Sequence, residues 1–171
     1  MTIIGTGDIA SAIIDRPDRL YFAAGVSNSG ETRPSEYRRE FDLLLDQPST
    51  GHLVYFSSLS TFSANGIYQQ HKRYMESMVQ RNFQLHAIIR IGNITWGKNK
   101  HTLINHLRAR YAAGLPLEVQ DVYRYVTDVD NFRGWLDRIP SDQSVEFNVI
   151  GRRLTVAQIV QEFVYGEKVA A

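Results

Sequence analysis

The chain lacks cysteine, so it can form no disulfide and offers no thiolate metal ligand or cysteine nucleophile. It also lacks an excess of charge, because 19 Lys and Arg residues balance 18 Asp and Glu residues to a net charge of +1. That balance gives no electrostatic reason to expect a nucleic-acid partner or an anionic membrane. No basic leader and no long apolar run is present, so we expect a cytoplasmic protein without a membrane partner.

Metal-ligand spacing is missing as well. The five histidines show no HxxxH or HExxH pattern, and His101 and His106 are five residues apart, which puts them on different faces of a helix. We therefore expect no metal site. A length of 171 residues with 43% hydrophobic residues suits one globular core, so we expect a single domain over residues 1–171.

The stretch Ser57–Lys72 contains a serine pair, then Tyr68, and then a lysine four residues on. If Tyr68 begins a helix, the Lys72 ammonium lies one turn below it, near the phenol. A cation there favours the phenolate and makes the tyrosine a usable proton donor and acceptor. A serine hydroxyl from the preceding strand could bind the same substrate oxygen. The three residue types suggest hydride chemistry at a carbonyl or alcohol, although a Tyr and a Lys one turn apart are more often a half-buried aromatic and a solvated cation.

The segment Thr2 to Ile14 reads as a strand, a glycine turn and a helix, with Gly5, Gly7 and Ala10 in a GxGxxA arrangement. In such a loop the first glycine allows a tight turn, the second lets the backbone approach a pyrophosphate, and the small third residue lets the helix pack closely. Asp8 lies inside this loop, where a carboxylate repels a pyrophosphate unless its side chain points away.

Strands and helices alternate along the rest of the chain. Apolar runs predict strands at Leu20–Ala24, His52–Ser57, Leu85–Ile91, Leu117–Val119, Tyr123–Val126 and Val145–Val149. Helical periodicity predicts helices at Pro34–Gln47, Gly66–Arg81 and Thr102–Ala113, a helix capped by Asp128, and a last helix opened by a Thr155/Gln158 capping box. This alternation predicts an α/β fold with a parallel sheet covered by helices.

In the helix Pro34–Gln47 the apolar residues recur at one spacing and the charged residues fall elsewhere. The apolar set is Tyr37, Phe41, Leu44 and Leu45, and the charged set is Arg38, Arg39, Glu40 and Asp42. We therefore expect Glu40 to lie off the buried face. In the next helix Met75 and Met78 share a stripe with Tyr68 and Lys72, and we interpret the methionines as core or interface residues.

Seven segments resemble, in the same order, motifs of the extended short-chain dehydrogenase/reductases, the sugar-nucleotide epimerase and dehydratase group. They are GTGDIA for the phosphate loop, YFAAGVSNS for the strand that usually reads HLAA, LVYFSSLSTFS for VFxSSxxVYG, YQQHK for YxxxK, IIRIGNITWG for RxxNxxG, RYVTDVDNFRGWLDRI for RDYVxVDDVAxA, and VEFNVIGRRLTVAQIVQEF for NVGxGxxxTxxEL. The resemblance implies a truncated Rossmann-like, mostly parallel sheet with a small carboxyl-terminal substrate-side region, and NAD or NADP as cofactor.

The resemblance implies a role for each matching residue. Ser58 aligns with the family's catalytic serine, Tyr68 with its acid/base tyrosine, and Lys72 with the lysine that holds the ribose hydroxyls and favours the phenolate. The other implied cofactor-binding residues are Gly5, Thr6, Gly7, Asp8, Ile9, Ala10, Ala23, Ala24 and Gly25. Asn93 aligns with an asparagine that often contacts substrate. Arg124 aligns with an arginine that can meet a diphosphate, and a solvated charge at a strand edge is an equal interpretation of it.

The chain also departs from the family. If YFAAG is the family's fourth strand, the second and third strands and their helices are missing, roughly fifty residues. The usual ribose-binding acid is then absent, and we do not assign its role to Glu31. The first strand becomes a sheet edge, and the adenosine half of the cofactor site is open, so we expect weak dinucleotide binding or completion by a partner. Leu59-Ser60 replaces the Asp-Glu of the 4,6-dehydratases, which disfavours that activity.

We therefore expect an NAD(P)-dependent oxidoreductase or epimerase that acts on a small molecule, a carbonyl or hydroxyl of a sugar-nucleotide-like substrate, by a Ser-Tyr-Lys mechanism. The alternative is a catalytically degenerate binding or scaffold protein. The resemblance also implies a homodimer through the helices Pro34–Gln47 and Gly66–Arg81, with Tyr37/Phe41 and Met75/Met78 as the contact faces, although burial of these faces within one core is equally allowed.

Overall fold

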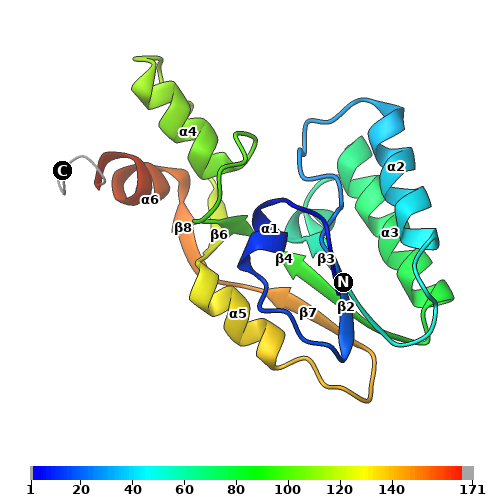
Figure 1. Ribbon diagram of the computed structural model, residues 1–171. Coiled ribbons are helices and arrows are strands. Elements are labelled where there is room, and N and C mark those ends of the chain that lie inside the picture. The colour runs from blue at the N-terminus through cyan, green and yellow to red at the C-terminus, as the bar shows by residue number, and fades with distance from the viewer. Residues whose placement is uncertain (1, 167–171) are drawn as a thin grey trace.

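A computed structural model describes residues 2–166 and contains a five-stranded parallel sheet with helices on both faces (Figure 1). The order across this sheet is β1-β2-β3-β4-β7, and each neighbouring pair is parallel. The strands are β1 (Ile3–Ile4), β2 (Arg19–Phe22), β3 (His52–Ser58), β4 (Leu85–Ile91) and β7 (Val145–Val149). The predicted α/β fold with a mostly parallel sheet is confirmed.

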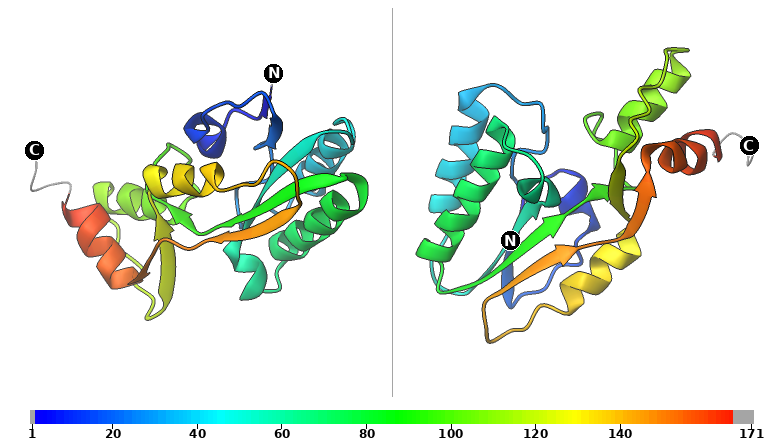
Figure 2. Two further views of the ribbon diagram at one scale, coloured as in Figure 1. Left: turned by 90° about the horizontal axis from the view of Figure 1, so that it is seen from below. Right: turned by 180° about the vertical axis from the view of Figure 1, so that it is seen from behind.

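Two helices cover each face of the sheet. The helices α2 (Pro34–Leu45) and α3 (Ile67–Asn82) lie on one face, and α1 (Asp8–Ala12) and α5 (Val129–Asp137) lie on the other (Figure 2). Each face has its own apolar cluster, because the strands are buried on both sides. Leu44, Met75 and Val79 fill the α2/α3 side, and Phe132 and Leu136 fill the α5 side.

A second, smaller sheet is formed by the later part of the chain, from Asn93 onward, and has its own helices. It has the order β5-β6-β8, with β5 parallel and β8 antiparallel to β6. Its elements are β5 (Asn93–Ile94), α4 (Leu103–Ala112), β6 (Tyr123–Thr127), β8 (Arg152–Thr155), α6 (Val156–Val160) and a π-helical turn, η2 (Gln161–Tyr165). A third apolar cluster holds α4, α6 and this sheet together.

The capping residues expected from the sequence occupy the helix ends. Asp128 accepts the backbone N–H of Asn131 at the start of α5, and Thr155 and Gln158 form the capping box of α6. Gly66 precedes α3, so that helix begins one residue later than expected. These capping side chains determine where α5 and α6 begin, because each accepts a backbone N–H group that has no partner within its helix.

Two expectations are wrong. Leu117–Val119 forms no strand: it follows Pro116, whose carbonyl accepts two N–H groups of Arg110, and Leu117 packs on the α4/α6 cluster instead of pairing. Glu40 does not lie off the buried face of its helix, because its side chain is completely buried. The reason is a set of polar partners within the protein, described below. The strand β8 was not expected from the sequence.

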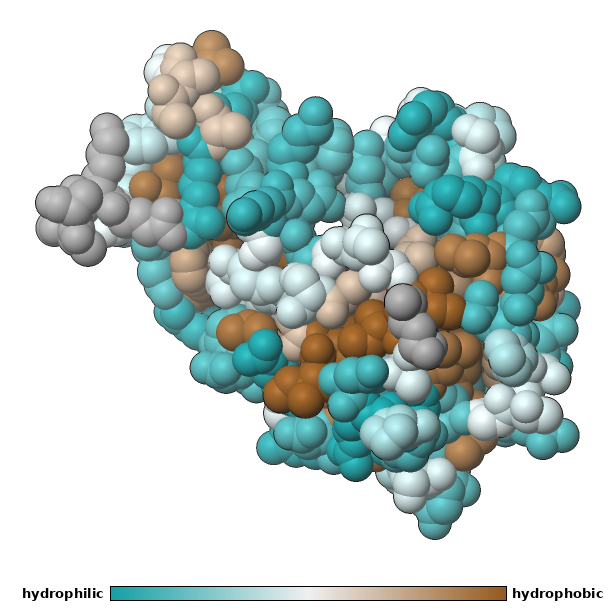
Figure 3. Space-filling model, in the orientation of Figure 1, coloured by the Kyte–Doolittle hydropathy of each residue, from teal (hydrophilic) through white to brown (hydrophobic). Residues whose placement is uncertain are grey.

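The strand β1 forms one edge of the large sheet. It pairs only with β2 among the described residues, as expected for a chain without the family's second and third strands. The helix after it is only five residues long. Figure 3 shows an apolar area beside this N-terminal segment, and Ile14, just after α1, is 66% exposed. The sheet edge therefore has an apolar surface next to unpaired backbone groups.

Candidate functional site

The carboxyl ends of β1, β2 and β3 lie at one end of the sheet, and each is followed by a segment singled out from the sequence. The glycine loop follows β1, Ala23–Gly25 follows β2, and Ser58 is the last residue of β3. Because the strands are parallel, these three segments meet at the same end of the sheet. This end is where ligands bind in open α/β sheets.

The two glycines of the loop have different reasons to be glycine. Gly5 has φ +118°, and a Cβ there would overlap the carbonyl group of Ala23, so the fold itself requires glycine. Gly7 has φ −80°, which any residue adopts, and a Cβ there would meet nothing within 4 Å among the described residues. The backbone at Gly7 therefore borders open space.

The Asp8 side chain is hydrogen-bonded within the protein. Its two carboxylate oxygens accept the backbone N–H groups of Lys98 and Asn99 at 2.9 and 3.0 Å, and its carbonyl accepts the Trp96 indole N–H at 3.0 Å. The carboxylate is thus bound to the loop that follows β5. The expectation that the Asp8 side chain turns away from a pyrophosphate bound at the glycine loop stays a prediction.

Ser58 is the accessible member of the serine pair. Ser57 is 7% exposed, whereas Ser58 is partly exposed at the strand end and begins a 3₁₀ helix, η1 (Leu59–Phe62). Its hydroxyl accepts the backbone N–H of Ser60 and lies 3.0 Å from the Ser60 hydroxyl, which in turn accepts the Gln69 amide N–H at 3.4 Å. This chain of hydroxyls joins the end of β3 to the first turn of α3.

Tyr68 and Lys72 lie in the first turns of α3 and both are buried, at 8% and 2% exposure. The Lys72 Nζ atom is 6.0 Å from the centroid of the Tyr68 ring. The ammonium donates to Glu40 Oε1 at 3.0 Å, to the Tyr55 hydroxyl at 3.2 Å and to the carbonyl of Phe56 at 3.5 Å. An ammonium has three N–H donors, so all of them are used within the protein.

Glu40 is the centre of a buried cluster that joins four segments of the chain. Besides Lys72, its carboxylate accepts the Tyr55 hydroxyl at 2.7 Å and the backbone N–H of Val26 at 2.7 Å, and its Oε2 lies 3.0 Å from His71 Nε2. A carboxylate is an acceptor only, so His71 carries its proton on Nε2. The His71 ring also packs on Tyr37, with centroids 4.7 Å apart.

The cluster keeps both Glu40 and Lys72 charged. Burial alone would raise the pKa of Glu40, but Lys72, His71 and the Val26 N–H outweigh it and hold that pKa well below its usual range. Burial alone would lower the pKa of Lys72, and the Glu40 carboxylate outweighs it, so the pKa of the lysine lies above its ordinary value. The two charges are therefore a stable ion pair at neutral pH.

The predicted substrate residues lie on the smaller sheet. Asn93, on β5, donates its side-chain N–H to the carbonyl of Tyr125 at 3.2 Å. Arg124, on β6, donates to the carbonyl of Tyr123 and to Gln120 Oε1. Both side chains thus hold loops and strands of this sheet, and substrate contact by either stays a prediction.

A cavity of about 410 Å³ opens beside the end of β2. It is lined by Gly25, Val26, Ser27, Asn28, Glu31, Arg33, Glu36, Arg39 and His101. The charges in it are paired, because Arg33 binds Glu31 and Arg39 binds Glu36. The hydrogen bond from Arg33 lowers the pKa of Glu31 to about 2, so this carboxylate is ionised at neutral pH. The cavity is polar and lies next to Gly25, which covers the Glu40–Lys72 pair.

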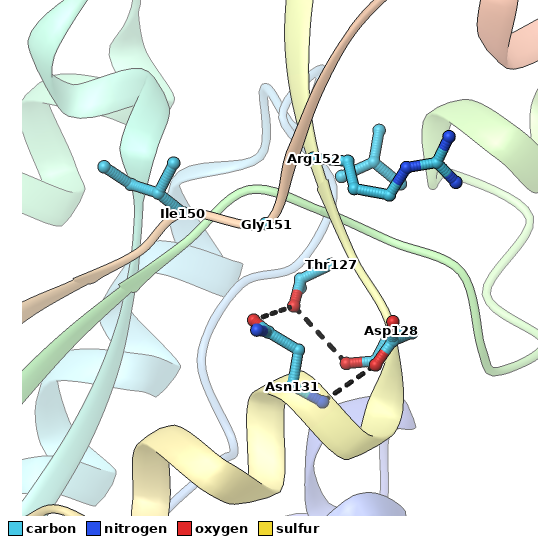
Figure 4. Close-up of a pocket in the computed structure, with 7 residues that line it drawn as sticks. Thr127, Asp128, Asn131, Ile150, Gly151 and Arg152 are labelled. Atoms are coloured by element: carbon cyan, nitrogen blue, oxygen red, sulfur yellow. Dashed lines mark hydrogen bonds between the residues drawn. The ribbon is translucent and has the colours of Figure 1, made fainter.

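A second cavity, of about 210 Å³, lies on the smaller sheet (Figure 4). Thr127 donates to Asn131 Oδ1, and Asp128 accepts the Asn131 backbone N–H, so these polar groups serve to begin α5. Arg152 points away from them and pairs with Glu162. We therefore place the candidate site at the larger cavity and the adjoining glycine loop.

Sequence reasoning missed Glu40, Tyr55 and His71. A signal for Glu40 was present: it lies three residues after Tyr37 and four before Leu44, which places it on the same helical face as these apolar residues. A carboxylate at such a position must have partners when buried. Nothing in the sequence identified those partners, because they come from β3, α3 and the segment after β2.

No protein-family model and no curated protein sequence matches the chain. Solved structures do match its fold. The enzyme WbmH of Bordetella bronchiseptica, in complex with NAD+, matches with a TM-score of 0.72 and 13% identity over 91% of this chain and 60% of its own. UDP-glucuronic acid 4-epimerase of Bacillus cereus matches with a TM-score of 0.64 and 12% identity, over 88% of this chain and 59% of its own.

UDP-glucose 4-epimerase of Thermotoga maritima matches with a TM-score of 0.64 and 16% identity, over 85% of this chain and 59% of its own. The chain thus spans about 60% of the length of these three structures. Together with the strand order, these matches confirm the fold expected from the sequence. The chain has, in abbreviated form, the Rossmann-like fold of these three enzymes.

Proposed function

We propose that the chain is an NAD(P)-dependent oxidoreductase or epimerase that acts on a carbonyl or hydroxyl of a sugar-nucleotide-like substrate. A bound nicotinamide supplies hydride transfer to or from the reacting carbon. Tyr68 would exchange the proton of the reacting oxygen, and the Ser58 hydroxyl would hydrogen-bond that oxygen as charge develops on it. Lys72 would supply a positive charge near the Tyr68 ring, 6.0 Å from its centroid.

The observation that carries this proposal is the open space at Gly7. Gly7 is the N-cap of α1, where glycine is favoured over alanine, but its backbone conformation is ordinary and a side chain would meet nothing within 4 Å among the described residues. A phosphate that approaches the backbone closely would give a further reason for glycine. The loop at Gly7 lies after β1, at the same end of the sheet as Ser58.

The proposed ligands agree with what the similar structures contain. WbmG of Bordetella bronchiseptica was solved with NAD and UDP, and the Bacillus cereus epimerase with a UDP-sugar and NAD. In this chain the glycine loop would take the dinucleotide, and the polar cavity of about 410 Å³ beside Gly25 has room for a sugar-sized group. The missing strands leave the adenosine side open, so we expect weak binding.

The substitution Gly7→Ala tests this proposal. The added methyl group fits the folded protein and restricts the unfolded chain, so the free energy of unfolding should stay equal or rise by up to about 1 kcal/mol. NADH binding, measured by calorimetry, should weaken at least tenfold because the methyl group blocks the approach of a phosphate. Gly134→Ala, the same change on α5 and outside the implied cofactor-binding residues, is the matched control. Equal NADH affinity for Gly7→Ala and the unchanged chain would contradict the dinucleotide site.

Turnover is tested with Tyr68→Phe. NAD(H) and NADP(H) are each combined with UDP-glucose and with UDP-glucuronic acid, and the products are separated by chromatography. The variant should lose turnover and keep its fold, as judged by circular dichroism. An unaffected rate would contradict the proposed role of Tyr68.

A second candidate function is a binding or scaffold protein of the same fold that no longer turns over. The observation that favours it is Lys72, whose three donors are all used by Glu40, Tyr55 and Phe56. Calorimetry separates the candidates, because an absence of heat and of thermal shift with NAD(H) and with NADP(H) at high protein concentration supports the scaffold. Dinucleotide binding together with turnover of a substrate contradicts it.

A further inference from the structure

We propose that Glu40 is a positioning residue that keeps the Lys72 ammonium inside the protein, so that Lys72 acts on Tyr68 through its charge and makes no contact with the ribose of a dinucleotide. The effect of Lys72 on Tyr68 and on a dinucleotide rests on the proposed function. The Glu40–Lys72 contact itself is a property of the fold and can be tested alone.

The hydrogen bonds of Lys72 leave none of its ammonium donors for a ribose. Its three donors go to Glu40, Tyr55 and Phe56, and the residue is 2% exposed. A ribose hydroxyl could be bound only if one of these contacts were given up. Release of Glu40 would leave a buried carboxylate without its cation, which is strongly unfavourable.

The backbone after β2 covers the Glu40–Lys72 pair. A Cβ at Gly25 would lie 2.6 Å from Lys72 Nζ and 2.8 Å from Glu40 Oε1, so this backbone packs directly on both groups. The next residue, Val26, donates its N–H to Glu40 Oε2. The segment after β2 therefore lies between the cavity and the ammonium, and Glu40 holds that segment in place.

Tyr68 lies close to the Lys72 cation. The Lys72 cation lies 6.0 Å from the centroid of its ring, within the range of a cation–aromatic contact. A carboxylate 3.0 Å from the same cation reduces the net charge that the phenol experiences. Glu40 thereby sets both the place of the cation and the strength of its effect on Tyr68.

The test is the NMR signal of the lysine ammonium groups. Lys98 and Lys100 are exposed, whereas the buried and fully hydrogen-bonded Lys72 should give a slowly exchanging ammonium signal, assigned by its loss in Lys72→Met. The signal should be lost in Glu40→Gln, which removes the charge, and partly recovered in Glu40→Asp, which restores it. Asp42→Asn, an exposed charge change on the same helix, should leave it unchanged.

NADH is then added to the unchanged protein at saturating concentration. The proposal expects the Lys72 signal to keep its position and its slow exchange while other resonances shift. A signal that is absent or insensitive to Glu40→Gln overturns the proposal, whatever NADH does. A Lys72 signal that moves with NADH overturns it and leaves the proposed function standing. If NADH and NADPH shift no resonance, the proposed function fails. The positioning role of Glu40 is then judged from Glu40→Gln and Glu40→Asp alone.

Discussion

The carboxylate of Asp8 accepts the backbone N–H of Asn99 at 3.0 Å, although 91 positions separate the two residues. The same carboxylate accepts the N–H of Lys98 at 2.9 Å. The glycine loop after β1 is therefore tied to the loop after β5, and the large sheet is joined to the smaller one at the candidate site. This contact compensates in part for the shortness of α1, which has only five residues to hold the loop.

Asp8→Ala should lower the free energy of unfolding by about 1–2 kcal/mol. A hydrogen bond to a charged group contributes about 1.5–3 kcal/mol, and because Asp8 is partly exposed to solvent, its two bonds together should contribute about the lower end of that range. Unfolding in urea, followed by tryptophan fluorescence, measures the change, since Trp96 donates to the Asp8 carbonyl. Thr6→Ala, in the same loop, is the control. A stability equal to that of the unchanged chain would show that the Asp8 contact contributes nothing.

Lys72→Met alone should destabilise the fold by about 3–5 kcal/mol, because it leaves the buried Glu40 charge without its cation. The double substitution Glu40→Gln with Lys72→Met removes both charges, and it should be more stable than Lys72→Met. A double-mutant cycle from urea unfolding measures the difference.

The control for this cycle is the exposed pair of Arg38 and Asp42 on α2, with side chains 73% and 50% exposed. Exposed pairs at this spacing contribute about 0.3–0.5 kcal/mol, so Arg38→Met should have little effect. Additive effects of the Glu40 and Lys72 substitutions would contradict a coupled buried pair.

The sequence predicted most of the fold because its local signals are strong. Asp128 and Thr155 mark helix starts, and Leu85–Ile91 is an apolar run of strand length that forms β4 with the same bounds. The strand β8 was missed because its sequence, RRLT, has no apolar alternation and exists through antiparallel pairing with β6. Pairing with a distant strand is not visible in a local pattern.

The site was predictable only in part, for the same reason. The YxxxK spacing correctly placed Tyr68 and Lys72 on consecutive turns of α3. The partners of Lys72 lie on α2 and β3, 32 and 17 residues away, so helical spacing could not identify them. The position of Glu40 on an apolar helix face did indicate its burial. A charged residue at such a position needs polar partners within the protein.

His52 should make the fold less stable in mild acid. It is 4% exposed, and neither ring nitrogen has a hydrogen-bond partner among the described residues. Burial, and secondarily the charge of Arg19, lowers the pKa of His52 below its ordinary value of 6.5, while Asp18 opposes this and His86 adds to it. The neutral ring is thus favoured in the folded state. The contribution of His52 to the free energy of unfolding is therefore complete above the pKa of this histidine in the unfolded chain, and it is lost as the pH falls below about 6.5.

The free energy of unfolding should therefore fall between pH 7.5 and pH 5, and His52→Leu should reduce this fall. Urea unfolding at the two pH values measures both. His101→Asn, which removes an exposed histidine, is the control variant. An equal fall for His52→Leu and the unchanged chain would exclude His52 as its source.

The exposed face of α2 and α3 should form a homodimer. Met75 is fully buried and belongs to the core, so it is not available for this contact, but Phe41 stacks on Tyr74 with ring centroids 5.9 Å apart, and Tyr74 is 52% exposed. Leu45, at the end of α2, is 42% exposed. A twofold axis would place two such aromatic faces against each other and remove them from water.

Light scattering at micromolar concentration should give twice the chain mass of 19.5 kDa. Tyr74→Glu places a charge in the centre of the apolar contact and should return the mass to that of one chain, with the circular dichroism spectrum unchanged. Tyr123→Glu is the matched control, because Tyr123 is 55% exposed on β6, which is part of the smaller sheet and not of the α2/α3 face. A single-chain mass for the unchanged protein would exclude this dimer, and loss of the dimer in Tyr123→Glu alone would place the contact on the smaller sheet.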